Sequence, residues 1–205
     1  MKASAIEQTA LKIGLNDATR SAEILREAAN LFAAKGYDGT SVQDIAQAVG
    51  ISKASLYHFF SDKSEIHSTV VVMALSRLIE LVKETIEFRQ TASDRVEGFA
   101  RAHAQYISEH KQFYFAAALG FYELADPEVK AKVHRMRDGY EDILRGIIRD
   151  GIAAGEFREL DVRLAARAVM SCMNWMARWW RPDGPEPAEK IASDYVHLII
   201  RGFLP

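Results

Sequence analysis

The scarcity of helix-breaking residues constrains the fold of this chain more than any other feature. Only five of its 205 residues are proline, and three of these lie between Pro182 and Pro187. The stretches between them carry apolar residues at spacings of three and four, the period of an amphipathic helix. No alternation with a period of two continues long enough to predict a strand. The sequence therefore predicts an all-α fold, with helices over nearly the whole chain.

Local signals at helix ends divide the chain into separate helices. Gly36 and Gly50 are expected to end the first two, and Ser41 with Asp44 forms a variant of the capping box at the start of the second. Ser52 is a good N-cap for the third helix. The predicted helices lie at about 19–35, 41–49, 52–59, 62–89, 93–110, 112–125, 126–154, 161–180 and 188–203.

Residues 41–60 have the features of a helix-turn-helix motif. Ala46 is the small residue needed where two short helices cross, and Gly50 provides the sharp turn between them. The apolar positions spaced to bury against the first helix are Val42, Ile45, Val49, Ile51, Leu56 and Phe60. The outer face of the third helix then carries residue types that bond to phosphates and base edges, namely Ser52, Lys53, Ser55, Tyr57 and His58.

Net charge gives no independent support for DNA binding. The whole chain carries a formal charge of −2, and residues 1–63 contain seven Lys or Arg and seven Asp or Glu. A DNA-binding domain usually shows an excess of basic residues, and this one does not. The hypothesis of DNA binding therefore depends on the motif alone.

Residues 20–66 resemble the N-terminal domain of the TetR family of repressors. The resemblance rests on the first helix, Gly36-Tyr37, Thr40, the spacing to Gly50, and Leu56-Tyr57-His58-Phe59-Phe60 followed by Lys63. It implies that Thr40 starts the second helix at the DNA backbone and that the third helix is the recognition helix. Tyr57 and His58 would then lie against phosphates or bases, and Lys63 would contact a phosphate. The predicted DNA-binding residues are Thr40, Ser41, Ser52, Lys53, Ser55, Tyr57, His58 and Lys63.

The last two predicted helices are apolar on more than one face. In residues 162–180, one stripe holds Val169, Met173, Met176 and Trp180, and another holds Ser171, Trp175, Arg178 and Trp179. The last helix has one face with Ile191, Tyr195, Leu198 and Gly202 and a second with Val196, Ile200 and Phe203. A helix that is apolar all round is buried on both sides, so we expect these two helices to form a homodimer. The alternative is a thick core within one chain.

Aromatic residues and arginines in the C-terminal part suggest a ligand site. Arg178 lies between two tryptophans on one helix face, where it suits an anion beside flat or acyl surface. Residues 175–184 resemble the branch of the TetR family that responds to acyl-CoA thioesters. The predicted ligand-binding residues are Phe115, Tyr122, Trp175, Arg178, Trp179 and Arg181. Two alternatives stay open: Arg181 pairs with Asp183 or Glu186, or the ligand is a drug or a free acid.

These features predict a tail at residues 1–18, a helix-turn-helix DNA-binding domain at 19–64 and a ligand-binding and dimerisation domain at 65–205. The joint is expected within or just before the fourth helix, since no flexible linker is visible. The predicted function is that of a repressor that binds a palindromic operator as a homodimer. A small-molecule inducer, of which an acyl-CoA thioester is the favoured class, would release it.

Other classes of function are less favoured. The six histidines show no metal-ligand spacing, and the chain has no nucleophile elbow, phosphate loop or Cys-x-x-Cys pair, which disfavours an enzyme, including one that binds acyl-CoA. We predict no catalytic residue, no metal site and no resident cofactor. A DNA binder without a ligand is disfavoured by the aromatic-rich C-terminal part, whereas activation instead of repression stays open.

The expected location is the cytoplasm. Charges interrupt every apolar run, so no segment is expected to span a membrane. Residues 1–16 lack the apolar centre of a signal peptide. A single cysteine, Cys172, excludes an internal disulfide framework and fits a reducing compartment.

Overall fold

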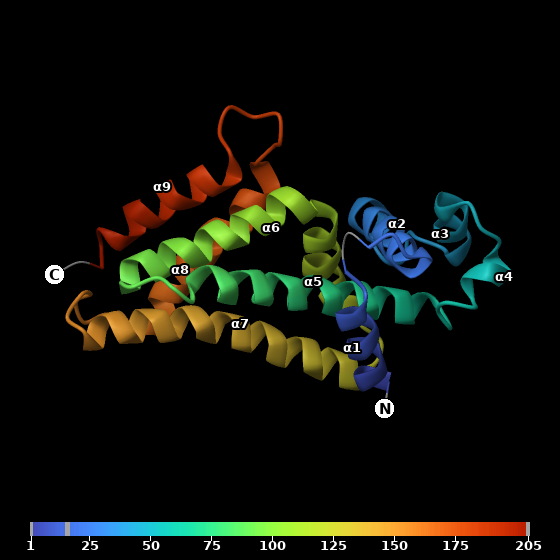
Figure 1. The fold of residues 1–205 in the computed structure, drawn as a ribbon, viewed down its shortest axis with the longest axis horizontal. Helices are drawn as coiled ribbons and strands as arrows, with labels where there is room; N and C mark the ends of the chain where they lie inside the picture. The colour runs from blue at the N-terminus through green and yellow to red at the C-terminus, as the bar shows by residue number, and fades with distance from the viewer. Residues whose placement is uncertain (1, 15–16, 204–205) are drawn as a thin grey trace. The chain divides into compact units, whose positions relative to one another are not determined.

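The computed structural model describes residues 2–14 and 17–203, and all regular secondary structure in these residues is helical. This confirms the predicted all-α fold. The helices, drawn in Figure 1, are α1 (Lys2–Lys12), α2 (Arg20–Lys35), α3 (Val42–Val49), α4 (Lys53–Leu56), α5 (Lys63–Ile86), α6 (Ala92–Gly120), the 3₁₀ helix η1 (Phe121–Glu123), α7 (Pro127–Ala153), α8 (Val162–Trp179) and α9 (Ala188–Ile200). Among the described helices none is long and apolar enough to cross a membrane.

Five helices differ from the sequence prediction, and two of them, α5 and α9, end three residues early, at Ile86 and Ile200. Helix α6 is continuous over the two helices expected at 93–110 and 112–125, but His110 has non-helical dihedral angles (φ −134°, ψ 40°), so the helix kinks where a break was expected. Helix α4 ends at Leu56, three residues early, and a turn follows it. Residues 2–12 form α1, which the sequence prediction treated as part of an N-terminal tail.

Ser41, Ser52 and Asp161 cap α3, α4 and α8 as predicted, whereas α6 is capped by Thr91, which accepts the Asp94 N–H, and not by Ser93 as expected. Ser41 and Asp44 form a reciprocal capping box at the start of α3, with both backbone bonds present. Ser52 accepts the Ser55 N–H at the start of α4, and Asp161 accepts two backbone N–H groups at the start of α8. These bonds satisfy N–H groups that have no partner inside the helix, so they fix where each helix begins.

The chain divides into two compact units. Unit 1 consists of residues 1–77 and 112–136, and unit 2 of residues 78–111 and 137–205. The core of unit 1 includes Ile24, Leu25, Ala28, Ile45, Leu56 and Ile66, all fully buried. The core of unit 2 includes Phe99, Ile107, Leu144, Ile147, Val169 and Met173. This division follows packing, whereas the boundary expected after residue 64 is a functional one and stays a prediction.

Helix α1 belongs to unit 1. Its Ile6 and Ala10, one helical turn apart, are both buried. Glu7 forms an ion pair with Lys132 of α7, and the Lys132 side chain is mostly buried. Helix α1 therefore packs on the first part of α7 rather than projecting into solvent.

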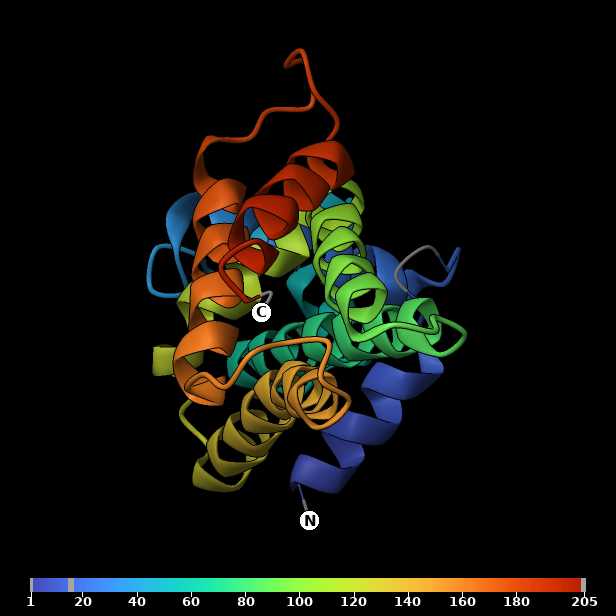
Figure 2. The same cartoon turned by 90° about the vertical axis from the view of Figure 1, so that its left-hand side faces the viewer.

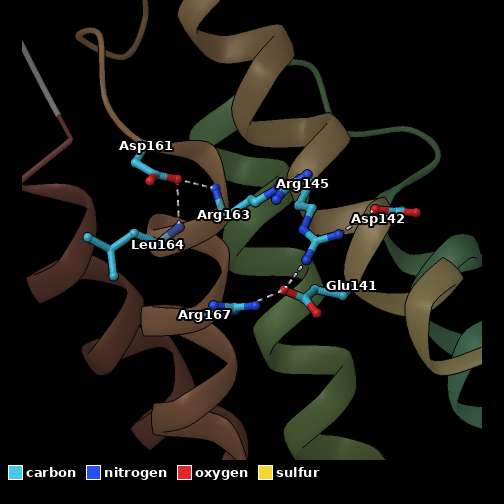
Figure 3. A network of polar contacts seen from close by, with 7 residues as sticks. All are labelled: Glu141, Asp142, Arg145, Asp161, Arg163, Leu164 and Arg167. Carbon is cyan, nitrogen blue, oxygen red and sulfur yellow. Dashed lines mark hydrogen bonds and ion pairs between the residues drawn. The ribbon is translucent and has the colours of Figure 1, made fainter. Parts of the chain in front are cut away.

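Polar contacts join α7 to α8 in unit 2. Figure 3 shows the Arg145 guanidinium between Glu141, at 2.6 Å, and Asp142, at 2.9 Å, with Arg167 of α8 3.8 Å from the same Glu141. The Glu156 carboxylate, in the loop between α7 and α8, accepts the N–H groups of Ala92 and Ser93 at the start of α6. Three helices of unit 2 are thus connected by charged groups at their ends and edges.

Helices α8 and α9 lie against each other, with the loop of residues 180–187 joining them at one end (Figure 2). Trp180 anchors this loop, because its indole N–H donates to the Glu186 carbonyl and its own carbonyl accepts from Lys111. Buried on the inner faces of the two helices are Val169, Met173, Met176, Trp180, Val196, Ile200 and Phe203. This is one of the two predicted stripes on each helix.

Candidate DNA-binding site

Helix α2 supports the helix-turn-helix through tight packing at a small residue. Ala46 of α3 is fully buried, as are Ile24 and Ala28 of α2. Of the six positions predicted to bury, four are buried (Ile45, Val49, Leu56 and Phe60) and two are half-buried (Val42 and Ile51). Thr19 caps α2 by accepting the Ala22 N–H. The apolar spacing therefore sets how α3 and α4 sit on α2.

Two glycines make the turns around α3. Gly50 ends α3 in the left-handed conformation (φ 72°, ψ 32°), which a residue with a Cβ adopts only at a cost. Gly36 also has a positive φ of 75°, but its ψ of 172° lies outside the left-handed helical region expected there. Both glycines therefore adopt a positive φ, but they differ in ψ and form different kinds of turn.

The outer face of α4 is exposed and polar. Ser52, Lys53 and His58 are exposed, Tyr57 is 45% exposed, and Ser55 is half-buried. The hydroxyls of Ser52 and Ser55 are 2.8 Å apart, and the Lys53 ammonium lies 5.9 Å from the centre of the Tyr57 ring. Ser41 is also exposed, at the start of α3. Six of the eight predicted DNA-binding side chains thus lie on α4, in the turn after it, or at the start of α3.

The side chains of the other two, Thr40 and Lys63, donate hydrogen bonds to backbone carbonyls within the protein. Thr40 is 1% exposed, and its hydroxyl donates to the Gly36 carbonyl at 2.9 Å. The Lys63 ammonium donates to the carbonyls of Tyr37 and Thr40, each at 2.9 Å, and lies 4.0 Å from the centre of the Tyr37 ring. Lys63 is half-buried. The Thr40 hydroxyl is therefore not part of the DNA-binding surface, and the ammonium of Lys63 holds the turn between α2 and α3.

Phe59, which was not among the predicted DNA-binding residues, is 43% exposed in the same turn as Tyr57. A helix through residue 59 would place Phe59 near the buried Leu56, one turn earlier. Because α4 ends at Leu56, residues 57–59 form a turn, and Tyr57, His58 and Phe59 are all exposed. Three consecutive aromatic or imidazole side chains in the sequence hinted at an exposed surface. Their exposure could be inferred only once the end of α4 at Leu56 was known.

Five of the six residues predicted to bind a ligand are exposed. Phe115 and Tyr122 belong to unit 1, and Trp175, Arg178, Trp179 and Arg181 belong to unit 2. Tyr122 is 77% exposed and Trp175 is 64% exposed, and only Phe115 of the six is half-buried. Arg181 lies 3.7 Å from Asp183 within the loop, which was the alternative left open. The assignment of these six side chains to a ligand therefore stays a prediction.

A polar pair lies instead in the core of unit 2. His103 of α6 and Tyr140 of α7 are buried, with His103 Nδ1 2.8 Å from the Tyr140 hydroxyl. Burial lowers the pKa of His103 to about 4, so its imidazole is neutral near pH 7. Phe99 stacks on Tyr140 with ring centres 4.9 Å apart.

Comparison with protein families matches both parts of the chain. Residues 24–68 match the family model described as bacterial regulatory proteins, tetR family. Residues 89–203, more than half of the chain, match the model described as tetracyclin repressor-like, C-terminal domain.

Individual proteins are similar over most of their length. The HTH-type transcriptional repressor KstR2 of Mycolicibacterium smegmatis is 30% identical over 197 residues, which cover 90% of this chain and 91% of that protein. The TetR family transcriptional regulator PfmR of Thermus thermophilus is 46% identical, with a TM-score of 0.81 over 87% of this chain and 97% of that chain. AibR, in a structure with isovaleryl coenzyme A and operator DNA, is 25% identical, with a TM-score of 0.77 over 88% of this chain and 97% of that chain.

The role of Lys63 inside the protein can be tested by substitution. Lys63→Met should lower the free energy of unfolding by about 1–3 kcal/mol, because the carbonyls of Tyr37 and Thr40 lose a charged donor. Lys53→Met, a matched change on the exposed face of α4, should change it by less than about 0.5 kcal/mol. Urea unfolding followed by circular dichroism measures both. Equal stability of the two variants would contradict this role.

Proposed function

Because the chain belongs to the TetR family of bacterial regulatory proteins, we propose that it is a ligand-released repressor that binds its operator as a homodimer. Membership in this family makes it a DNA-binding transcriptional regulator and not an enzyme. The observation that carries the proposal is the exposed polar and aromatic surface of residues 52–59, held on α2 by the buried side of the same segment.

The DNA-binding surface is proposed to consist of Ser41, Ser52, Lys53, Ser55, Tyr57, His58 and Phe59. Lys53 supplies the positive charge for a phosphate, and the hydroxyls of Ser52 and Ser55 supply donors of the kind that contact phosphate oxygens. Tyr57, His58 and Phe59 present rings that can pack on sugars or reach base edges in a major groove. Since residues 1–63 have no net charge, affinity must come from these few contacts rather than from a basic surface.

The proposed dimer interface is an apolar surface on the outer faces of α8 and α9. Leu164 and Trp175 of α8 are 68% and 64% exposed, and Leu198 of α9 is 66% exposed. The rings of Trp179 and Tyr195 lie 6.5 Å apart, which connects the two helices across this surface. Exposed apolar surface of this extent is typical of protein–protein interfaces. The rival idea of a thick core within one chain does not account for these exposed side chains.

A homodimer carries two copies of α4, as recognition of a palindrome requires. Helix-turn-helix dimers bind half-sites roughly 34–36 Å apart, one turn of DNA, so both copies must match this spacing at once. A ligand that binds more tightly to a dimer with a different spacing therefore weakens operator binding. The largest factor by which it can do so is the ratio of its affinities for the two forms of the dimer.

An acyl-CoA thioester is the proposed class of ligand. The support is that AibR, similar to this chain over 88% of its length, has been solved with isovaleryl coenzyme A and operator DNA. The six side chains predicted to bind the ligand give this choice no support of their own, because five of them are exposed. A free acid or a drug is the alternative, and a titration separates these classes.

The DNA-binding proposal predicts tight binding to the region upstream of this protein's own gene. In a gel-shift assay, Lys53→Ala and Tyr57→Ala should each weaken binding at least about tenfold, since each removes a phosphate or base contact. Lys83→Ala, which removes an exposed charge from α5, is the matched control and should bind like the wild type. Equal binding of wild type and both α4 variants would contradict the assigned surface.

The dimer proposal predicts that a charge in the apolar surface separates the subunits. Size-exclusion chromatography with light scattering should find a dimer for the wild type and a monomer for Leu198→Asp, because a carboxylate cannot be buried there without a partner. Leu119→Asp places the same charge at a half-exposed leucine of unit 1 and should stay dimeric. A monomeric wild type, or a dimeric Leu198→Asp variant, would exclude this interface.

The ligand proposal predicts release by thioesters and not by free acids. The complex with upstream DNA is titrated with CoA thioesters of short, long and aromatic acids, and in parallel with the same acids without CoA. Release by at least one thioester, at concentrations where its free acid has no effect, is the expected result. Release by free acids alone would replace the thioester with the alternative ligand class.

A further inference from the structure

A close contact in unit 1 joins the start of α5 to the end of α6. His67, on the first turns of α5, is 1% exposed. Gly120 is the last residue of α6, and a methyl group in place of its hydrogen would overlap His67 Nε2 and crowd the rest of the imidazole ring. The ring therefore packs directly on the Gly120 backbone, and no larger residue fits at this position without movement.

The same imidazole contacts α2 and the turn between α2 and α3. Its ring centre lies 4.6 Å from that of Tyr37 and 5.1 Å from that of Phe32, with the Phe32 ring edge-on. Tyr37 lies in the turn between α2 and α3, and Lys63, four residues before His67, holds that turn by two hydrogen bonds. Gly120, His67 and Tyr37 therefore form a continuous line of contacts from the end of α6 to the segment that starts α3.

His67 carries a polar atom that is unsatisfied in this arrangement. Its Nε2 is buried and has no hydrogen-bond partner among the residues that the structure describes. Burial first, and the nearby charge of Lys63 second, lower the pKa of His67 to about 4, so the ring is neutral near pH 7. A buried polar atom without a partner costs free energy that an apolar side chain of similar size would not. Movement of Gly120 away from the ring would give Nε2 access to a partner and recover this cost.

We propose that His67 is the positioning residue through which the end of α6 controls the turn between α2 and α3. A shift of Gly120 toward the ring moves His67 against Tyr37, and with it the turn that places Ser41 and α3. A shift away relieves the unsatisfied nitrogen and loosens the same contact. The inference deepens the proposed function, and rests on it, because it names the residue that links the end of α6 to the DNA-binding surface.

The test is a double-mutant cycle of Gly120→Ala and His67→Ala in the full chain. Gly120 has ordinary helical angles (φ −74°, ψ −8°), so alanine is compatible with the backbone and acts through its contact with His67. The matched control is Gly139→Ala on α7, where an added methyl group meets no described atom within 4 Å. Amide hydrogen exchange reports on residues 36–41, and a gel shift reports on operator affinity.

We expect Gly120→Ala to have an effect only when His67 is present. Gly120→Ala should change amide exchange at residues 36–41, and operator affinity, about tenfold, and Gly139→Ala should change neither. In the His67→Ala background, adding Gly120→Ala should produce no further change beyond about twofold. If the effects of Gly120→Ala are confined to residues 112–136, or are the same with and without His67, the inference is wrong.

Two further outcomes are distinguishable. If Gly120→Ala does not fold, His67→Leu takes its place. This variant removes the unsatisfied nitrogen and should slow exchange at residues 36–41 severalfold, whereas unchanged exchange there overturns the inference. If the exchange results are as expected but the wild type binds no sequence-specific DNA, then His67 links the two segments while the proposed function fails.

Discussion

The hydrogen bonds from the Lys63 ammonium to the carbonyls of Tyr37 and Thr40 are the interaction on which the geometry of the DNA-binding surface depends. They attach the first turn of α5 to the loop that follows α2, and this loop leads directly into the capping box of α3. The Tyr37 ring covers the same ammonium, which keeps the charge partly out of water while its donors are used. The position of α3, and through Gly50 that of α4, therefore depends on this charged group and two carbonyls together with the apolar packing on α2.

Features governed by neighbouring residues were predictable from the sequence, and features governed by distant contacts were not. The capping box at Ser41 and Asp44, the cap at Ser52 and the crossing at Ala46 each depend on a few adjacent positions, and all three are present. The end of α4 was predicted three residues too late, because local propensity does not show that the backbone turns after Leu56, where the N–H groups of Phe59 and Phe60 both donate to the Leu56 carbonyl. Thr40 and Lys63 were assigned to DNA because the sequence cannot show that Gly36, Tyr37 and Thr40 offer carbonyls to them. Helix periodicity correctly separated the two faces of α8, but it does not tell whether the outer face meets a ligand or another subunit.

The DNA-binding segment and helices α8 and α9 differ in how much apolar surface they expose. In the DNA-binding segment, apolar side chains are turned inward and the exposed rings are few and close to hydroxyls and a lysine. On α8 and α9, in contrast, large apolar side chains remain exposed in the single chain, although the inner faces of both helices are already filled. In the proposed homodimer these side chains would be buried between subunits, which would link the stability of the folded chain to its concentration.

The kink at His110 has a consequence for how such a chain can diversify. Residues of α6 before the kink pack in unit 2, and residues from 112 onward pack in unit 1. In an unbroken helix, inserting or deleting one residue rotates the rest of the helix by about 100°. An insertion in the part of α6 that packs in unit 2 would therefore turn the apolar face of the following part, which packs in unit 1, toward solvent. An irregular residue between the two halves absorbs such a rotation. The half of α6 in unit 2 can therefore be remodelled in length and sequence while the half that ends at Gly120 keeps its register beside His67.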